Sequence, residues 1–189
     1  MKKLVLASAN KGKIKEIRQM LKDSFEVVGY KELGLDFDIV EDGETFYENA
    51  LIKAKAVSNA LNLPALADDS GLCVDALNGE PGIYSARYAG DGDDEHNNDL
   101  VLEKLKGEKN RTARFVCTMV LYNTDGSIIT AEGVTEGDIL TERQGTNGFG
   151  YDPIFFSKDL GKSLGIATDE EKNSISHRAR ALNKLKESL

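Results

Sequence analysis

The 189-residue sequence predicts an α/β fold with two lobes around a substrate cleft. Three observations support this expectation. An apolar strand, an amphipathic helix and a second strand follow one another, which is the βαβ pattern of an α/β sheet. A longer amphipathic helix then leads into another apolar strand. A long hairpin interrupts the alternation and favours a second lobe. The segments are, in order, residues 3–8, 10–23, 25–30, 44–63, 64–69 and 111–140.

The remaining segments complete this organisation. Residues 79–98 are rich in glycine and acidic residues and are expected to form a loop, followed by a helix over 99–107. Residues 145–156 read as a glycine-rich loop that enters a short apolar segment. A helix is expected from Thr168, which can form a capping box with Glu171. Because no repeat or linker separates these segments, we expect one domain over residues 1–189.

The composition limits the classes of partner. Apolar residues make up 40% of the chain, charged residues 30%, and the net charge is −8. A nucleic-acid polymer is not expected as partner, because phosphate contacts along it need a basic face. A small phosphorylated ligand needs only a few lysines and arginines. No membrane partner is expected either, because the longest apolar run, FVCTMVLY, is too short to span a bilayer.

The start of the chain and its cysteines bear on location. The start, MKKLVLASANKGK, fits a first strand better than a signal peptide. Cys73 and Cys117 form no CxxC pair, so both are expected to be buried thiols, in accord with a cytoplasmic location.

Two adjacent carboxylates follow the apolar strand at 64–69. Asp68 and Asp69 are expected to end this strand before a Ser-Gly turn. Carboxylates at the carboxyl end of a strand in an open α/β sheet lie where such folds bind ligands. They can hold Mg²⁺, or one of them can activate water as a general base. The alternative is a pair of Asp residues that only form a turn.

Two further segments carry groups suited to phosphate. The stretch SANKGK, from Ser8 to Lys13, lies where the first strand meets a helix N-terminus, which favours an anion. A solvated turn is the alternative there. On the long helix, Asn49 and Lys53 share one face, preceded by Glu41 in an acidic turn. A solvated helix face is the alternative.

A fourth group of residues suits a nucleobase. Phe149 offers a flat apolar face among glycines, and Asp152 can accept hydrogen bonds. Lys172, His177 and Arg178 supply donors if the last helix is continuous. These residues can equally be ordinary surface groups. Together, the lysines, the carboxylates and the aromatic ring with its donors suggest a nucleoside polyphosphate hydrolase.

At these residues the chain resembles the Ham1-like inosine/xanthosine triphosphate pyrophosphatases. The matching segments occur in order over nearly the whole chain: SANKGKIKE, EDGETFYENALIKAKA, ADDSGLCVDALNGEPGIYSARYAG, GTNGFGYDPIFF and EEKNSISHRARAL. The resemblance implies a mixed, twisted central sheet and a homodimer. It also implies Mg²⁺-dependent hydrolysis of the nucleoside triphosphates ITP, dITP and XTP to the nucleoside monophosphate and pyrophosphate, which removes these non-standard purines from the nucleotide pool.

The resemblance also assigns roles to residues. Asp69 is implied as proton acceptor, and Glu41, Asp69 and the neighbouring Asp68 as metal-binding acids. The implied substrate contacts are Ser8, Ala9, Asn10, Lys11, Gly12, Lys13, Lys53, Ser70, Phe149, Gly150, Tyr151, Asp152, Lys172, His177 and Arg178. Two rivals stay open, namely a nucleotide sensor without catalysis and a hydrolase of modified pyrimidine triphosphates or another phosphoanhydride.

Overall fold

A computed structural model describes residues 1–189. Its seven strands are hydrogen-bonded in the order β2-β1-β3-β4-β5-β6-β7. β1 runs parallel to both β2 and β3, whereas β6 is antiparallel to β5 and β7. The sheet is therefore mixed, and the predicted α/β class is confirmed. The strands are β1 (Lys2–Leu6), β2 (Phe25–Gly29), β3 (Ala65–Val74), β4 (Thr112–Tyr122), β5 (Ile128–Ile139), β6 (Phe155–Ser157) and β7 (Lys162–Ser163).

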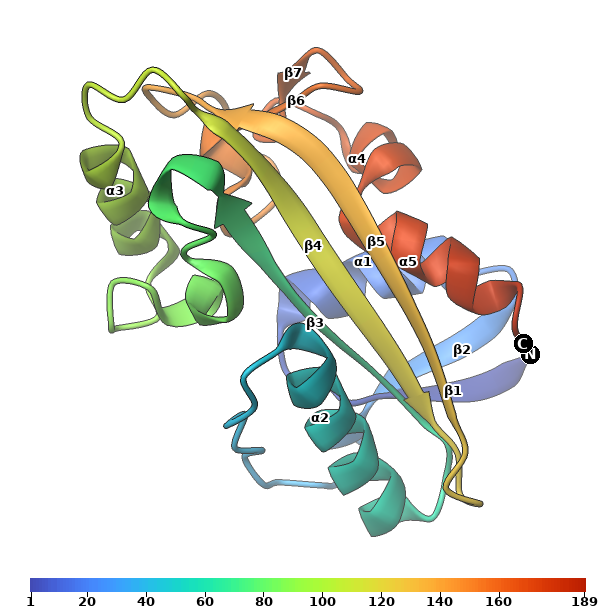
Figure 1. Ribbon diagram of the computed structural model, residues 1–189. Coiled ribbons are helices and arrows are strands. Elements are labelled where there is room, and N and C mark those ends of the chain that lie inside the picture. Colours follow the sequence, from blue (N-terminus) through green and yellow to red (C-terminus); the bar gives the residue numbers. More distant parts are fainter. The chain divides into compact units, whose positions relative to one another are not determined.

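Five α-helices accompany these strands (Figure 1): α1 (Lys11–Leu21), α2 (Phe46–Leu61), α3 (Asp94–Lys104), α4 (Asp169–Ile175) and α5 (His177–Lys186). None of them is long and apolar enough to cross a membrane. The chain forms two compact units. Unit 1 comprises residues 1–69, 117–132 and 181–189, and unit 2 comprises residues 70–116 and 133–180.

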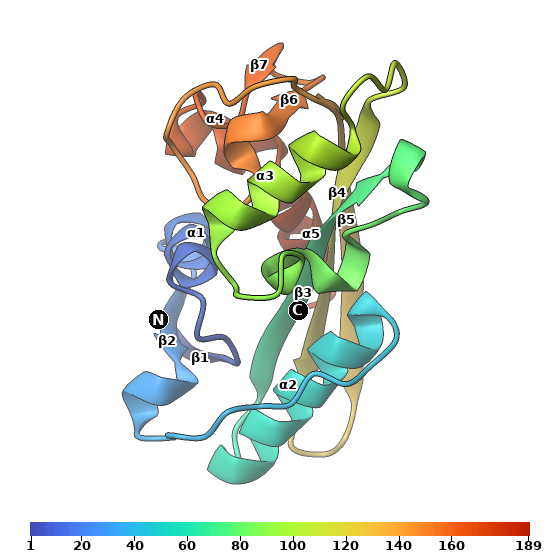
Figure 2. The same cartoon turned by 90° about the vertical axis from the view of Figure 1, so that its left-hand side faces the viewer.

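Unit 1 has a helix layer on each face of its strands (Figures 1 and 2). On one face, α1 and the end of α5 bury Ile17, Leu21 and Leu182 against β1, β3 and β4. On the other face, α2 presents Ala50, Ala54 and Val57 at helical spacing. These small side chains let the helix backbone approach the strands closely. The βαβ start of the chain and the long helix are both confirmed.

Unit 2 has its own apolar core, built from α3, the end of β3, the start of β4 and the segment from Tyr151 to Ala167. Phe115 and Phe155 pack there with ring centroids 4.4 Å apart. Gly137 lies against Phe155 and Phe156, because a Cβ at this position would come within 2.3 Å of the Phe156 carbonyl oxygen. A side chain at this one position of β5 would therefore collide with β6, whereas the neighbouring pairs Asp138–Phe156 and Ile139–Phe155 accommodate theirs.

Two sequence expectations are wrong in detail. β3 does not end at Asp69 but continues to Val74. The acidic stretch before residue 99 is not a loop, because α3 begins at Asp94. Asp93 caps this helix, with its carboxylate accepting hydrogen bonds from the backbone N–H groups of Glu95 (2.8 Å) and His96 (3.2 Å). An N-cap Asp followed by acidic residues was the signal for this start.

The C-terminal helix also differs from the expectation. The capping box of Thr168 and Glu171 is present, but the helix breaks at Ser176, whose ψ of 157° is extended. Lys172 on α4 and His177 on α5 thus belong to separate helices. The cysteines form no disulfide; Cys117 is buried, whereas Cys73 is only partly buried, contrary to expectation.

Candidate active site

Asp68 and Asp69 lie in the middle of β3, on opposite faces of the strand. Successive side chains of a strand alternate between the two faces. Asp68 lies on the same face of β3 as Leu66, two positions earlier, which belongs to the core under α1. Asp69 lies on the same face as Ala67, which packs under α2. Both carboxylates are buried, with residue exposures of 0% and 8%. The adjacent charges are therefore directed apart, and each meets a different helix.

On the α1 face, Asp68 is paired with a lysine of the SANKGK segment. Lys13 Nζ lies 3.2 Å from Asp68 Oδ2. The thiol Sγ of Cys117, on β4, lies 3.9 Å from the same oxygen. A fully buried carboxylate needs such a partner, because an uncompensated buried charge is strongly destabilising.

The turn before α1 is organised by its own polar side chains. Asn10 is the N-cap of α1, and its Oδ1 accepts the backbone N–H of Lys13 at 3.1 Å. Ser8 Oγ accepts the N–H of Asn10 at 3.2 Å. No acidic residue occupies the first turn of the helix. The segment from Ser8 to Lys13 thus forms a polar turn at a positive helix end, which suits a phosphate group.

On the α2 face, one lysine is surrounded by three acidic residues. Lys53 Nζ lies 3.0 Å from Glu41 Oε1 and 3.9 Å from Asp69 Oδ1. It also donates a 2.6 Å hydrogen bond to the backbone oxygen of Asp68. Burial alone would lower the pKa of Lys53, but the negative charges of Asp68, Glu41 and Asp69 outweigh it and raise the pKa. Lys53 is therefore held as a buried ammonium group.

Asn49 holds the segment that carries Glu41, a role that sequence reasoning missed. Its Oδ1 accepts the backbone N–H of Gly43 at 2.8 Å, and the residue is 2% exposed. A Cβ at Gly43 would come within 2.8 Å of that same oxygen. The helical spacing of Asn49 and Lys53 was visible in the sequence, but the loop partner was not.

Asp69 has the features of a base and of a metal ligand. Burial raises its pKa; the charges of Lys53 and Lys13 lower it, and those of Glu41 and Asp68 raise it further. The other oxygen, Oδ2, is buried and accepts no hydrogen bond. An oxygen in this state can take a proton or a cation, so the residue fits both predicted roles.

The three predicted metal-binding acids do not gather into one cluster. No group of three or more His, Cys, Asp or Glu side chains is arranged to hold a metal ion. Glu41 and Asp69 approach the same ammonium group, whereas Asp68 faces α1. One or two carboxylates with waters and substrate phosphates are the usual ligands of Mg²⁺, so the Glu41–Asp69 pair fits this ion.

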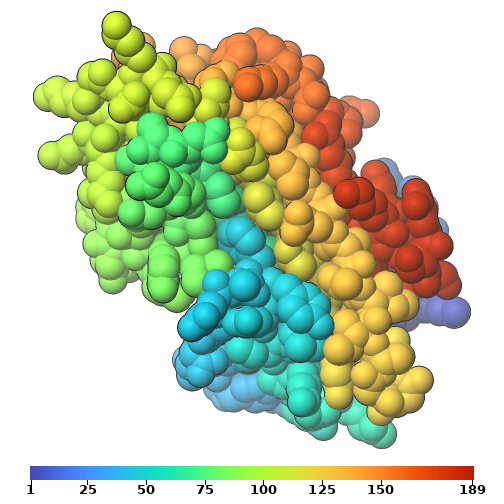
Figure 3. Space-filling model, in the orientation of Figure 1, coloured from blue at the N-terminus to red at the C-terminus, as the bar shows by residue number.

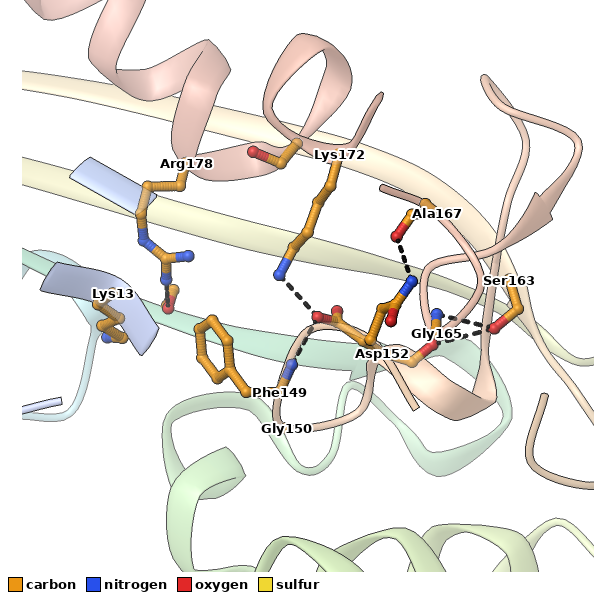
Figure 4. Close-up of polar contacts among 12 residues, drawn as sticks. Lys13, Phe149, Gly150, Asp152, Ser163, Gly165, Ala167, Lys172 and Arg178 are labelled. Atoms are coloured by element: carbon orange, nitrogen blue, oxygen red, sulfur yellow. Dashed lines mark hydrogen bonds and ion pairs between the residues drawn. The ribbon is translucent and has the colours of Figure 1, made fainter. Parts of the chain in front are cut away.

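In unit 2, the Asp152 carboxylate is hydrogen-bonded to two other predicted base-binding residues, Phe149 and Lys172. Its Oδ2 accepts the backbone N–H of Phe149 at 3.0 Å and a hydrogen bond from Lys172 Nζ at 2.6 Å. Figure 4 shows Lys172 and Arg178 extending from their helices towards the Phe149 ring. Lys172 Nζ lies 4.5 Å from the ring centroid, within the range of a cation–π contact. A Cβ at Gly148 would come within 2.1 Å of the Asp152 carboxylate, so glycine is required there.

Arg178 and His177 lie at the start of α5. Arg178 is 1% exposed and donates a 2.9 Å hydrogen bond to Ser70 Oγ, and its guanidinium carbon lies 5.9 Å from the centroid of the Phe149 ring. His177 stacks on Phe115, with ring centroids 4.9 Å apart and an interplanar angle of 15°. Unit 2 thus brings Ser70, Phe149 and Arg178 together, while His177 packs against the core.

A groove elsewhere in unit 1 does not coincide with these residues. It has a volume of about 380 Å³ and lies between the start of α2 and the strands β4 and β5. Figure 3 shows the α2 segment beside β5 on this face. Its lining residues are Thr45, Phe46, Tyr47, Thr118, Thr130, Ala131 and Glu132. None of them is a predicted site residue.

The fold is thus that of an α/β protein, with lysines and carboxylates that suit phosphate and metal in unit 1 and an aromatic ring with fixed donors in unit 2. Comparison with known proteins agrees. Residues 4–188 match the Ham1 family, and the chain belongs to that family.

Relatives match over the full length. The chain is 48% identical to a dITP/XTP pyrophosphatase of Clostridium perfringens over 199 aligned residues, which cover 100% of this chain and 98% of that protein. It is similar to the solved structure of the Staphylococcus aureus Ham1 protein, with a TM-score of 0.88, 46% identity and coverage of 99% and 97%. A Ham1 protein from Coxiella burnetii has a TM-score of 0.89, 41% identity and coverage of 100% and 98%.

Proposed function

We propose that this protein is a dITP/XTP pyrophosphatase. It hydrolyses non-standard purine nucleoside triphosphates to the nucleoside monophosphate and pyrophosphate. Relatives with this activity align with the entire chain at 48% identity. The structural observation that carries the proposal is the environment of Asp69. This residue is a buried carboxylate with a raised pKa and an unpartnered oxygen, beside a buried ammonium group.

In the proposed mechanism Asp69 accepts a proton from water. The water oxygen attacks the α-phosphorus, and the bond to the bridging oxygen of the β-phosphate breaks. Burial raises the pKa of Asp69 and makes it a stronger base than an exposed carboxylate. Lys53 is a buried ammonium group, and its positive charge lowers the pKa of Asp69 and so limits this rise.

The lysines bind the phosphate chain in this account. Lys13 lies at the start of α1 beside the turn from Ser8, and Lys53 projects from α2. A lysine ammonium acts as a point charge for phosphate oxygens. The unpartnered Asp69 oxygen and the nearby Glu41 support a Mg²⁺ site, which would contribute positive charge near the reacting phosphate.

The base is proposed to stack on Phe149 in unit 2. Hypoxanthine and xanthine carry a 6-oxo group that accepts hydrogen bonds, and Arg178 is always a donor. Adenine presents a 6-amino donor at that position instead. Guanine keeps the oxo group but adds a 2-amino group, which costs about 1–3 kcal/mol if it is buried unpaired. Hydrogen bonds can therefore select the base where stacking alone cannot.

Two further expectations rest on the family resemblance. We expect a homodimer, which light scattering coupled to gel filtration will detect as twice the mass of one chain. We also expect a cytoplasmic location, because the substrates belong to the nucleotide pool and no disulfide constrains the chain.

Product analysis of dITP turnover tests the proposed function. With Mg²⁺ present, phosphorus NMR should show deoxyinosine monophosphate and pyrophosphate in equal amounts. Orthophosphate with deoxyinosine diphosphate would indicate attack at the terminal phosphate and contradict the proposal. Binding of dITP without any product would favour the sensor.

A further inference from the structure

Helix α3 is hydrogen-bonded to the loop that carries the Phe149 ring. Asp94, the first residue of α3, accepts the backbone N–H of Gly150 through Oδ2 at 3.0 Å. Asn98, one turn later, donates through Nδ2 to the backbone oxygen of Gly150, also at 3.0 Å. The i, i+4 spacing places both side chains on one face of the helix. One residue of the loop, Gly150, thus has its N–H and its C=O held by the same helix.

These contacts fix the backbone on both sides of Phe149. The peptide before Phe149 is held because its N–H donates to Asp152 Oδ2 at 3.0 Å. The peptide after Phe149 is held because the N–H of Gly150 donates to Asp94. With both peptide planes fixed, the φ and ψ angles of Phe149 are set, and so is the direction of its Cα–Cβ bond.

The same helix also holds the beginning of this loop. Arg143 donates through an Nη2 hydrogen to Asp99 Oδ1 at 2.8 Å and to the backbone oxygen of Glu95 at 2.9 Å. The loop from Arg143 to Gly150 is therefore attached to α3 at both ends. The acidic residues of the stretch DGDDEHNND have a structural use that their composition alone did not reveal.

Asn98 is the stronger of the two anchors. It is fully buried, whereas Asp94 is exposed. Asn98 Nδ2 also donates to the backbone oxygen of Asp94 at 2.9 Å, so the amide bridges the first turn of α3 and the loop. Both hydrogens of Asn98 Nδ2 are thus donated to backbone oxygens, while Oδ1 is buried and accepts no hydrogen bond. The two acceptors set the orientation of the amide, and the amide in turn holds the carbonyl group of Gly150.

We propose that Asn98 and Asp94 are positioning residues for base recognition. They act through Gly150 to hold the Phe149 ring where the purine stacks. This inference rests on the proposed role of Phe149 in base binding. It assigns the acidic helix to nucleotide affinity and not to the chemistry of phosphoryl hydrolysis.

The test separates nucleotide affinity from catalysis. For Asn98→Ala, we expect the KM for dITP to rise about tenfold, as loss of one buried hydrogen bond implies. The kcat should stay within about twofold and inhibition by inorganic pyrophosphate should be unchanged, since neither the reacting groups nor the phosphate site is touched. Loss of kcat with unchanged KM, or equal weakening of pyrophosphate, would overturn the inference.

A matched pair of surface variants controls for loss of helix stability. Asp93→Ala removes the cap of α3 but no contact to Gly150, whereas Asp94→Ala removes the contact and leaves the cap. We expect only Asp94→Ala to raise the KM for dITP, and Asp94→Asn, which keeps an acceptor, to restore it. Equal effects of Asp93→Ala and Asp94→Ala would show that helix stability alone matters and would overturn the inference.

A double-mutant cycle with Phe149→Ala identifies the route. If Asn98 acts through the ring, Asn98→Ala should change the KM by less than about twofold once the ring is absent. A full tenfold effect in both backgrounds would overturn the inference and leave the proposed function intact. If Phe149→Ala by itself leaves the KM for dITP unchanged, the proposed base site fails and the inference fails with it.

Discussion

Asp68 and Asp69 are adjacent in the chain but face opposite sides of β3, and each is next to a different lysine. Lys13 Nζ lies 3.2 Å from Asp68, and Lys53 Nζ lies 3.9 Å from Asp69. The strand thus separates two like charges that would repel each other on one face. The two carboxylates therefore have different surroundings. Asp68 pairs with the lysine of the SANKGK segment, whereas Oδ2 of Asp69 is buried and accepts no hydrogen bond.

The substitution Asp69→Asn tests whether Asp69 is the general base of the hydrolysis. The substitution preserves shape and removes charge and basicity. General-base catalysis contributes about 10²–10⁴-fold, and a lost metal ligand adds to this. We expect less than a tenth of wild-type turnover of dITP at saturating Mg²⁺. Retention of more than that fraction, measured as pyrophosphate release, would show that Asp69 is not the base.

Lys53→Met tests whether Glu41 and Asp69 can hold Mg²⁺. The variant leaves two buried or half-buried carboxylates without their ammonium partner, and loss of one partner of a buried pair costs about 3–5 kcal/mol. Mg²⁺ can offset that repulsion. We therefore expect millimolar Mg²⁺ to raise the Tm of Lys53→Met more than that of the wild type. Equal shifts of Tm in both proteins would mean that these carboxylates do not bind the ion.

Lys13→Ala tests the phosphate site on α1. We expect calorimetry to show about tenfold weaker binding of pyrophosphate, because a charge-assisted hydrogen bond contributes about 1.5–3 kcal/mol, and no change for inosine, which has no phosphate. Lys15→Ala, an exposed lysine on the same helix, serves as the control and should bind pyrophosphate normally. Equal losses for pyrophosphate and inosine would indicate a general disturbance and not a lost phosphate contact.

Arg178→Lys tests base selection with a smaller risk of misfolding than Arg178→Ala, since Arg178 is nearly fully buried. Lysine keeps the positive charge but lacks the guanidinium group and its fixed pair of donors. We expect kcat/KM for ITP to fall at least tenfold more than kcat/KM for ATP, because only the 6-oxo purine accepts a hydrogen bond from the guanidinium. Phe149→Ala should lower both about equally. An unchanged ITP-to-ATP ratio in Arg178→Lys would direct attention to Asp152 and the backbone of the glycine-rich loop.

Asp75 on the surface of unit 2 gives a prediction for acid stability. Hydrogen bonds from Arg114 and Thr112 lower the pKa of Asp75 to about 2. A carboxyl with a lowered pKa stabilises the fold above its usual pKa of about 4, and this contribution is lost as the pH falls through about 2. Asp75→Asn should therefore be less stable than wild type at pH 7, by about 0.2–1 kcal/mol as for exposed ion pairs.

Urea unfolding at several pH values provides the measurement. The difference between wild type and Asp75→Asn should be constant from pH 7 to about pH 5, shrink below about pH 4 and be lost as the pH falls through about 2. A difference in the free energy of unfolding that does not shrink between about pH 5 and about pH 2 would assign the effect to packing.

The sequence predicted elements with strong local signals and failed where distant partners decide the outcome. The helices α1 and α2 follow from their apolar spacing and from polar caps at Asn10 and Thr45. β3 was expected to stop at Asp69, because Asp-Ser-Gly is a turn sequence. It continues to Val74, and the two aspartates within it lie beside lysines from α1 and α2, which a local pattern cannot bring together.

The candidate site shows the same limit. The motifs identified the residue types, but spacing could not place Asp68 and Asp69 on different faces of a continuing strand. The break at Ser176 was also missed, because the stretch from Thr168 contains no proline or glycine that would signal it. The hydrogen bond from Asn98 to the backbone oxygen of Gly150 joins residues 52 positions apart, and no local sequence pattern can reveal such a contact.

The most direct measurement is a panel of initial rates with Mg²⁺ and equal concentrations of dITP, XTP, ATP, GTP and dUTP, with pyrophosphate and orthophosphate quantified separately. The account predicts pyrophosphate as the product, and kcat/KM values for dITP and XTP that exceed those for ATP and GTP by at least about 100-fold, the discrimination that hydrogen-bond recognition of a base can supply. Comparable rates for ATP and dITP, faster hydrolysis of dUTP, or release of orthophosphate would contradict it.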